Sequence, residues 1–175
     1  MNMIRTFALV LTVATALSGC YMRDDDSSVF DHITIHEGNI AVHARNASDA
    51  TVTPAGDLSI DGKVVTLTSE QRDLLKQYYA QVMALRNDGI ATGKAGAAMA
   101  GQAIGTVASG LAHGNPDSIG PAIDAKAKGI ETKAMAVCND VEALRAKQTV
   151  IASALPAFKP YATIEANEVS DCRSQ

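Results

Sequence analysis

The hydrophobic periodicity of this chain changes at Thr68, and this change limits the fold more than any other feature. Apolar and polar residues alternate through residues 31–68, as they do in half-buried strands. Apolar residues then recur three and four positions apart through residues 69–155, as in amphipathic helices. Glu37-Gly38 and Asp61-Gly62 lie between alternating segments and predict hairpin turns. We therefore expect an α+β fold, with a small antiparallel sheet in the N-terminal half followed by three or so packed helices.

The helical region carries its own start and stop signals. Thr68 and Gln71 have the spacing of a capping box at the start of the first helix. Asn87-Asp88-Gly89 predicts a stop or a bend in that helix. A second apolar seam between Ile123 and Leu144 predicts a long amphipathic helix that packs on a partner. Residues 156–172 follow as a tail, and its last part is expected to be a loop or a short strand.

Small residues recur four positions apart in the first part of the helical region. This series includes Gly93, Ala97, Gly101 and Gly105. Small residues at this spacing let two helices approach closely, and in lipid they drive helix association. The favoured interpretation is a soluble hairpin in which this ridge packs tightly on the helix of the Ile123–Leu144 seam. Membrane insertion and a flexible linker are the alternatives, but large apolar residues are sparse and each Gly weakens a helix by about 1 kcal/mol.

The first 20 residues predict export and lipidation. Arg5 precedes an uncharged apolar run that ends at Leu17, which is short for a membrane span. Leu17-Ser18-Gly19-Cys20 resembles a bacterial lipobox. Residues 1–19 are therefore expected to be a lipoprotein signal peptide, and Cys20 the lipidated N-terminus, which acyl chains hold on a membrane. Because Tyr21 rather than Asp follows, we expect the periplasmic side of the outer membrane.

The remaining cysteines agree with export. Residues 20–30, with three consecutive aspartates, are expected to be a flexible acidic tether. Once Cys20 carries lipid, Cys138 and Cys172 remain, and an even pair in an oxidising compartment predicts a disulfide. A redox pair usually has Cys-x-x-Cys spacing, which these two lack. Residues 31–172 are thus expected to form one domain with a disulfide-tied tail.

Three histidines in the predicted sheet are the candidate metal ligands. His32 and His36 point to the same side of their strand. If Glu37-Gly38 is a two-residue turn, His43 lies opposite His32, with Cβ atoms about 5 Å apart. Two histidines at that distance can share a transition metal. The alternative, which we favour, is the solvated face of a half-buried sheet, because the spacing supplies no third ligand.

Composition and motifs weigh against several functional classes. The net charge of -4 disfavours nucleic acid as a partner. With 4% aromatic residues the chain has little with which to build a stacking platform for bases or sugars. It contains no G-x-S-x-G, H-E-x-x-H or phosphate-loop motif. We therefore expect no catalytic residues, no enzymatic activity and no cofactor.

Several segments together resemble a known family. They are the strands through Leu58–Thr68, Ser69-Glu70-Gln71 running into Leu74, Leu75, Tyr78 and Tyr79, the Ala/Gly helix, Cys138, Leu155-Pro156-Ala157-Phe158, Pro160-Tyr161 and Cys172. The chain resembles, through these segments, the YggN-like group of exported bacterial proteins of unknown function. The resemblance implies export and strands followed by helices, and it supplies no catalytic residues.

The expected function is that of a membrane-anchored periplasmic lipoprotein. Its molecular activity is unknown, and we expect a protein-interaction or structural module of the envelope with an unidentified protein partner. One alternative is an inhibitor or immunity-type lipoprotein that acts against an envelope-targeting toxin or hydrolase. The other is a metal-binding module that uses His32, His36 and His43.

Overall fold

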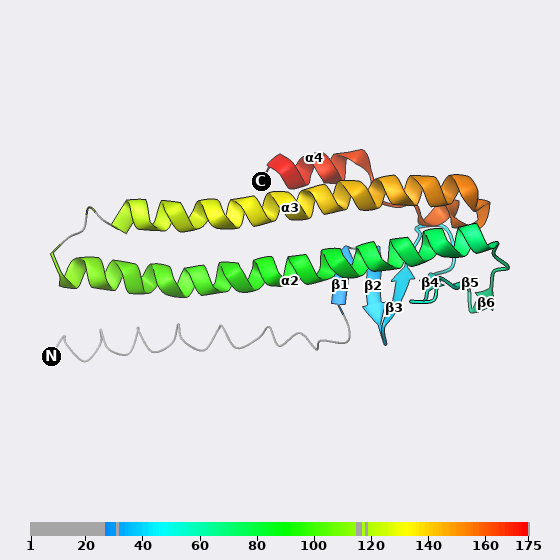
Figure 1. The fold of residues 1–175 in the computed structure, drawn as a ribbon, viewed down its shortest axis with the longest axis horizontal. Helices are drawn as coiled ribbons and strands as arrows, with labels where there is room; N and C mark the ends of the chain where they lie inside the picture. The colour runs from blue at the N-terminus through cyan, green and yellow to red at the C-terminus, as the bar shows by residue number, and fades with distance from the viewer. Residues whose placement is uncertain (1–26, 31, 115–116, 118, 175) are drawn as a thin grey trace, which may run out of the picture.

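The computed structural model describes residues 27–30, 32–114, 117 and 119–174, and within them a long helical hairpin lies across a small sheet (Figure 1). The sheet of these residues has six antiparallel strands whose order in space is their order in the chain. The elements are β1 (Ser27–Phe30), β2 (Ile33–His36), β3 (Asn39–Val42), β4 (Ala50–Val52), β5 (Leu58–Ile60), β6 (Lys63–Val64), α2 (Ser69–Ala112), α3 (Ile119–Ala154), the 3-10 helix η2 (Pro156–Tyr161) and α4 (Ala166–Ser174). The predicted α+β fold, with a sheet first and helices after it, is confirmed.

The turn residues set the register of the sheet. Glu37 and Gly38 have φ of 49° and 74°, and Asp61 and Gly62 have φ of 53° and 70°. Positive φ at both central residues defines the tight turns that match the twist of a hairpin. Ile33 consequently pairs with Val42, and both side chains are fully buried. Both predicted hairpins are confirmed.

The expected tether is wrong for its last residues. Ser27–Phe30 form β1, which pairs with β2 at the edge of the sheet. Strand pairing uses backbone groups, so a polar segment can add to an edge without an apolar pattern. The rest of the tether, residues 20–26, lies outside the described residues.

The first helix starts as predicted and then runs on. The Thr68 hydroxyl accepts from the Gln71 amide at 3.3 Å, and the Gln71 side chain accepts from the Thr68 amide at 3.0 Å. The helix does not stop at Asn87-Asp88-Gly89, because α2 is one continuous helix of 44 residues. A single Gly costs about 1 kcal/mol in a helix, which the neighbouring turns of a long helix outweigh.

The core lies between the sheet and one half of the helical hairpin. It holds the apolar faces of the strands, the first five turns of α2 and the second half of α3. Tyr78, Phe158 and Tyr161 fill its centre, with the rings of Tyr78 and Phe158 edge to face at 5.6 Å. These aromatic side chains are the largest in a core otherwise built mainly of Ile, Leu and Val.

Beyond the core the hairpin continues as an arm, which we define as residues 89–112 of α2 with residues 119–137 of α3. The last large buried side chain of α2 is Leu85, and the first buried residue of α3 is Cys138. Among the described residues of the arm, only Gly110 is buried. At 1.5 Å per residue the α2 part of the arm is about 36 Å long. Figure 1 shows the arm projecting past the sheet.

The tail is helical, which corrects the expected loop or short strand. Residues 156–161 form η2, and α4 packs back on α3. Val169 of α4 is buried, so α4 adds to the core. None of the helices in the described part of the chain has a stretch both long and apolar enough to cross a bilayer.

Candidate functional site

The predicted disulfide is present. Cys138 of α3 and Cys172 of α4 are bonded across 34 residues, with Cα atoms 5.7 Å apart. Arg173 pairs with Glu142 and also donates to the Asn139 side chain at 3.1 Å, so the same helices are joined at the surface. The bond is structural, since both sulfurs lie at the α3–α4 contact. Cys20, the predicted lipidation site, lies outside the described residues.

The sheet histidines have the predicted register, and their rings contact carboxylate and hydroxyl groups. The His43 amide donates to the His32 carbonyl at 2.8 Å, which confirms that these residues lie opposite each other. The His43 ring is held between Asp49, 2.9 Å from Nδ1, and Thr34, 2.9 Å from Nε2. His32 Nε2 lies 3.5 Å from Glu168 of α4.

His36 does not complete a ligand set. Its ring is largely exposed and lies 3.8 Å from the Glu37 carboxylate. Across the ranges that the structure describes, no three or more His, Cys, Asp or Glu side chains gather where they could hold a metal ion. The predicted metal site at His32, His36 and His43 is therefore not supported, because carboxylate and hydroxyl partners occupy the imidazoles of His32 and His43 instead.

The ridge of small residues does not pack on α3, which corrects the helix-packing prediction. Gly93, Ala97, Gly101 and Gly105 are exposed, and a Cβ added at any of the three glycines would meet nothing within 4 Å. With 3.6 residues per turn, each step of four advances about 40° around the helix. A series spaced by four therefore winds away from any straight neighbour.

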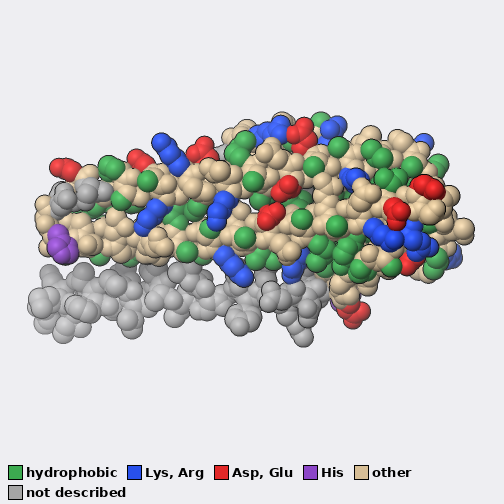
Figure 2. Space-filling model, in the orientation of Figure 1, with side chains coloured by type: hydrophobic (Ala, Val, Ile, Leu, Met, Phe, Trp, Pro, Cys, Tyr) green, Lys and Arg blue, Asp and Glu red, His purple; other side chains and the backbone are tan. Residues whose placement is uncertain are grey.

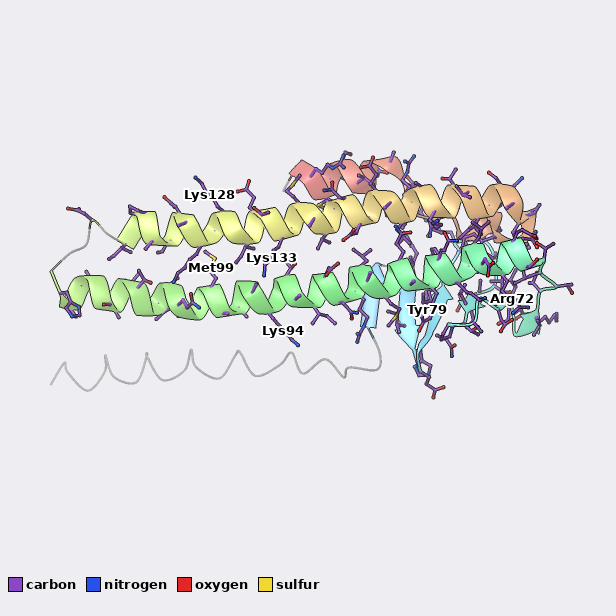
Figure 3. The ribbon with its side chains drawn as sticks, in the orientation of Figure 1. Arg72, Tyr79, Lys94, Met99, Lys128 and Lys133 are labelled. Carbon is purple, nitrogen blue, oxygen red and sulfur yellow. A yellow bond between two sulfur atoms is a disulfide. The ribbon has the colours of Figure 1, made fainter. Side chains whose placement is uncertain are left out.

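A different set of residues, most of them small, faces α3. The half-buried and buried positions of α2 in the arm beyond Ile90 recur by threes and fours apart from the adjacent pair Ala95 and Gly96; they are Thr92, Ala95, Gly96, Met99, Ala103, Thr106 and Gly110. Figure 3 shows Met99 pointing toward α3 and Lys94 pointing away from it. Short side chains at these positions let the two helices approach closely.

The arm also presents an exposed apolar face, which we call the outer stripe. It consists of seven residues in a heptad pattern: Ile90, Gly93, Ala97, Ala100, Ile104, Val107 and Leu111. Side chains of Ile104, Val107 and Leu111 are 73%, 38% and 67% exposed, and they are half of the large exposed hydrophobic residues that the structure describes. In the sequence Ile104, Val107 and Leu111 share a face apart from the ridge, but the glycines at intervals of four obscure the full heptad.

The outer stripe extends the face of α2 that packs on the sheet. Leu75 is fully buried in the core and lies 36 residues, or ten turns, before Leu111. Val82 is also buried and lies five turns before Ala100. The same helix face is thus buried in the core at one end, and its stripe residues from Gly93 to Leu111 are exposed in the arm.

Charged residues are scarce on this part of α2. Between Asp88 and His113 the chain has one charged residue, Lys94. Figure 2 shows red and blue side chains close together at the sheet end and others spaced along the arm. The other charged residues of the arm as defined above are on α3: Asp124, Lys126, Lys128, Glu131 and Lys133. Depletion of charge at the centre of a surface is typical of protein interfaces.

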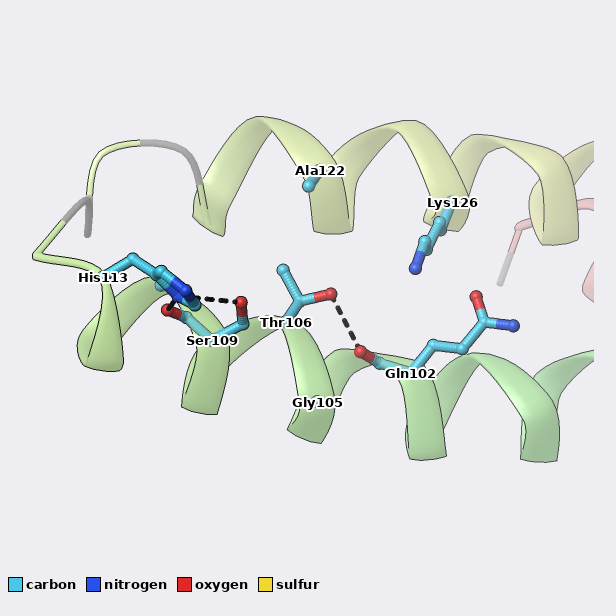
Figure 4. A pocket seen from close by; sticks show the side chains of 8 residues that line it. Gln102, Gly105, Thr106, Ser109, His113, Ala122 and Lys126 are labelled. Carbon is cyan, nitrogen blue, oxygen red and sulfur yellow. Dashed lines mark hydrogen bonds between the residues drawn. The ribbon is translucent and has the colours of Figure 1, made fainter.

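A groove of about 670 Å³ lies at the tip of the arm, between α2 and α3. Figure 4 shows Lys126 reaching into it from α3. Thr106 donates to the Gln102 carbonyl at 2.9 Å. His113 Nδ1 lies 2.8 Å from the Ser109 carbonyl and 3.4 Å from the Ser109 hydroxyl. Because a carbonyl only accepts, Nδ1 carries a proton and cannot take one from Ser109. His113 Nδ1 therefore does not act as a base toward Ser109.

Comparison with known proteins places the chain in a family. Residues 28–119 match the family described as Protein of unknown function (DUF2884), and this match covers more than half of the chain, from β1 to the first residue of α3. No curated protein matches the chain. No solved structure matches it either. The chain therefore belongs to the DUF2884 family, whose function is unknown.

Proposed function

We propose that this protein is a non-enzymatic lipoprotein of the bacterial envelope, related to the YggN-like exported group. In this proposal residues 1–19 are a signal peptide, and lipid on Cys20 holds the domain on the periplasmic side of the outer membrane. The arm then binds another protein through its outer stripe. The observation that supports the proposal is that the arm exposes this apolar face while adding almost nothing to the core.

The energetics favour a partner for the outer stripe. Moving one Leu, Ile or Val side chain out of water contributes roughly 1.5–3 kcal/mol. The three large side chains of the stripe lie one helical turn apart, so a single partner can cover all of them together. Contiguous exposed apolar surface of this kind marks interaction sites on soluble domains.

The anchor and the arm would be close to each other. Six residues lie between Cys20 and Ser27, so the seven Cα–Cα steps of an extended chain span at most about 25 Å. β1 begins at Ser27 and contacts α2. A lipid on Cys20 would therefore keep the arm near the membrane surface, where its partners would be other envelope proteins.

The anchor is tested by Cys20→Ser in the full-length chain. We expect the parent protein to fractionate with the outer membrane and to carry the mass of a diacylglyceryl group. The variant should lose that mass and leave the membrane fraction. Cys172→Ser is the matched control, because it removes a cysteine of the disulfide and should leave fractionation unchanged. An unmodified Cys20 in the parent would refute the anchor.

The binding surface is tested with a photo-reactive amino acid at Ile104 in living cells. The control position is Ala98, which is also exposed on the arm but lies on another face of α2. We expect a discrete adduct from position 104 that is absent from position 98. Equal labelling of abundant proteins from both positions would refute the interaction function.

A further inference from the structure

We propose that the partner of the outer stripe is a second copy of this chain, packed antiparallel with residue 102 of the two copies at the symmetry axis. This inference rests on the proposed function, because it names the partner of the surface described there. It is carried by the order of large and small residues along the stripe.

The stripe is divided by size. Its first half after Ile90 holds Gly93, Ala97 and Ala100, and its second half holds Ile104, Val107 and Leu111. In a two-helix seam each layer must fill one constant gap between the axes, because interiors are close-packed. A parallel pair would place large residues on large ones and small on small, which crowds one end and leaves voids at the other.

The antiparallel register resolves this mismatch in every layer. With residue 102 at the two-fold axis, each residue meets the one whose number sums with its own to 204. Gly93 then faces Leu111, Ala97 faces Val107, and Ala100 faces Ile104, each from the other copy. Every layer combines one large and one small side chain. Such an arrangement is the self-complementary interface of a symmetric dimer.

Charge and length also suit this register. Lys94 of the two copies would be offset by 16 residues, or about 24 Å along the axis, well beyond the screening length of about 8 Å. Gly114 at the tip of one arm would meet Ile90 of the other copy. Leu85 is the last large buried side chain of α2, and the overlap of the two arms in this register, residues 90–114, begins after it.

The size of the surface predicts a weak dimer. The stripe is about 32 Å long on a helix about 10 Å across, so each copy buries roughly 300 Å², against about 800 Å² per partner in a stable complex. Lipid anchoring would raise the local concentration of copies by confining them to one surface. We therefore expect the dimer to form readily on a membrane and only at high concentration in solution.

The register is tested by disulfide cross-linking of full-length chains. Ala97→Cys carries one epitope tag, Val107→Cys carries another, and both are oxidised separately and as a mixture at high protein concentration. We expect about tenfold more cross-linked dimer in the mixture, because a disulfide needs Cβ atoms about 4 Å apart. In either variant alone the paired thiols would be offset by ten residues, or about 15 Å.

Two controls make the measurement specific. The parent chain gives the background from Cys20 and from exchange with Cys138–Cys172. A mixture of Ala98→Cys with Val107→Cys tests proximity away from the stripe, because position 98 is exposed on another face of the same helix. This mixture should give no more dimer than the parent.

Other occupants of the stripe give distinct outcomes. Equal cross-linking within single variants would mean a parallel or random pair and would overturn the proposal. A disulfide from position 107 to Cys20 of the same chain would make the N-terminal segment the occupant. Protection of that thiol by phosphatidylethanolamine–phosphatidylglycerol vesicles, without mixed dimers, would make lipid the occupant. Both results would also overturn it.

Failure of this inference is separable from failure of the proposed function. If position 104 captures a different protein in cells while the mixture gives no dimer, the arm binds a partner but not itself. If the mixed dimer forms and Cys20 is unmodified, self-association stands and the lipid anchor is refuted.

Discussion

The contact between the β4–β5 turn and α2 can be measured with two glycines that share one backbone conformation. Gly56 has φ of +78°, and a Cβ placed there would lie 2.4 Å from the Arg72 carbonyl oxygen and 2.8 Å from Lys76 Cγ. Gly62 has φ of +70°, and its added Cβ would meet nothing within 4 Å. Substituting Ala at either site forces a left-handed residue at a cost of about 1–2 kcal/mol. The clash is present only at Gly56.

At Gly56→Ala the clash adds a second energetic cost to that of the backbone strain. The Arg72 carbonyl belongs to the backbone of α2, so the turn must shift away from the helix. Overpacking of this kind costs about 1–3 kcal/mol. We expect Gly62→Ala to lose about 1 kcal/mol of unfolding free energy and Gly56→Ala about 3 kcal/mol, combining the strain with the overpacking cost. At roughly 2–4 °C per kcal/mol these losses correspond to about 3 and 10 °C in Tm.

The assay is urea unfolding of both variants and the parent, followed by circular dichroism. Because the φ angles are nearly equal, the backbone strain is nearly the same in both variants. The difference between their losses of unfolding free energy therefore measures the effect of the close approach to α2. Equal losses at the two positions would refute the docking of this turn against Arg72. A larger loss at Gly62 would mean that backbone strain, rather than the contact, dominates.

Three further predictions concern the core. Gln148 is 1% exposed and joins the Ile164 amide to the Tyr78 hydroxyl, so Gln148→Leu should lose about 1–3 kcal/mol in urea unfolding; unchanged stability would refute that role. Reduction of Cys138–Cys172 opens a 34-residue loop and should lower unfolding free energy by about 4 kcal/mol; a Tm that reductant does not change would contradict this. Burial raises the pKa of Tyr78, and the Gln148 hydrogen bond partly opposes it, so its stability contribution is complete below pH about 10 and falls as pH rises further. Between pH 9 and pH 11 the unfolding free energy of Tyr78→Phe, measured in urea titrations, should therefore fall less than that of the parent. Equal losses would contradict this role of Tyr78.

The sheet was predictable because its determinants are local. Glu37-Gly38 and Asp61-Gly62 specify two-residue turns, and two-residue turns fix which strand residues pair. β1 was not predictable, since an edge strand needs only backbone partners and Ser27–Phe30 carry no alternating apolar pattern. Register follows from turn chemistry, whereas the number of strands does not.

The site was less predictable because its partners come from distant parts of the chain. The Cys138–Cys172 bond could be inferred, since only two cysteines remain once Cys20 is set apart. The partner of His32 is Glu168, which lies 136 residues further along the chain. Nothing in the sequence around His32 signals a carboxylate from α4. The candidate metal site considered from the sequence was therefore built from the sheet alone and lacked Glu168, which lies beside the His32 ring.

The contact with α3 does not by itself account for the Ala and Gly content of α2. The proposed contact of the outer stripe with a second copy would supply the rest of the reason. One neighbour, α3, takes the positions around Ala95, Met99 and Ala103, where short side chains permit close approach. The outer stripe lies on a second face, about 120° away around the helix, and it contains Gly93, Ala97 and Ala100. A helix approached closely on one side needs small residues at about two positions in seven. In the proposed dimer α2 would be approached on two sides and would need about twice that number, so Gly93, Ala97 and Ala100 on the second face would have the same physical reason as Ala95 and Ala103 on the first.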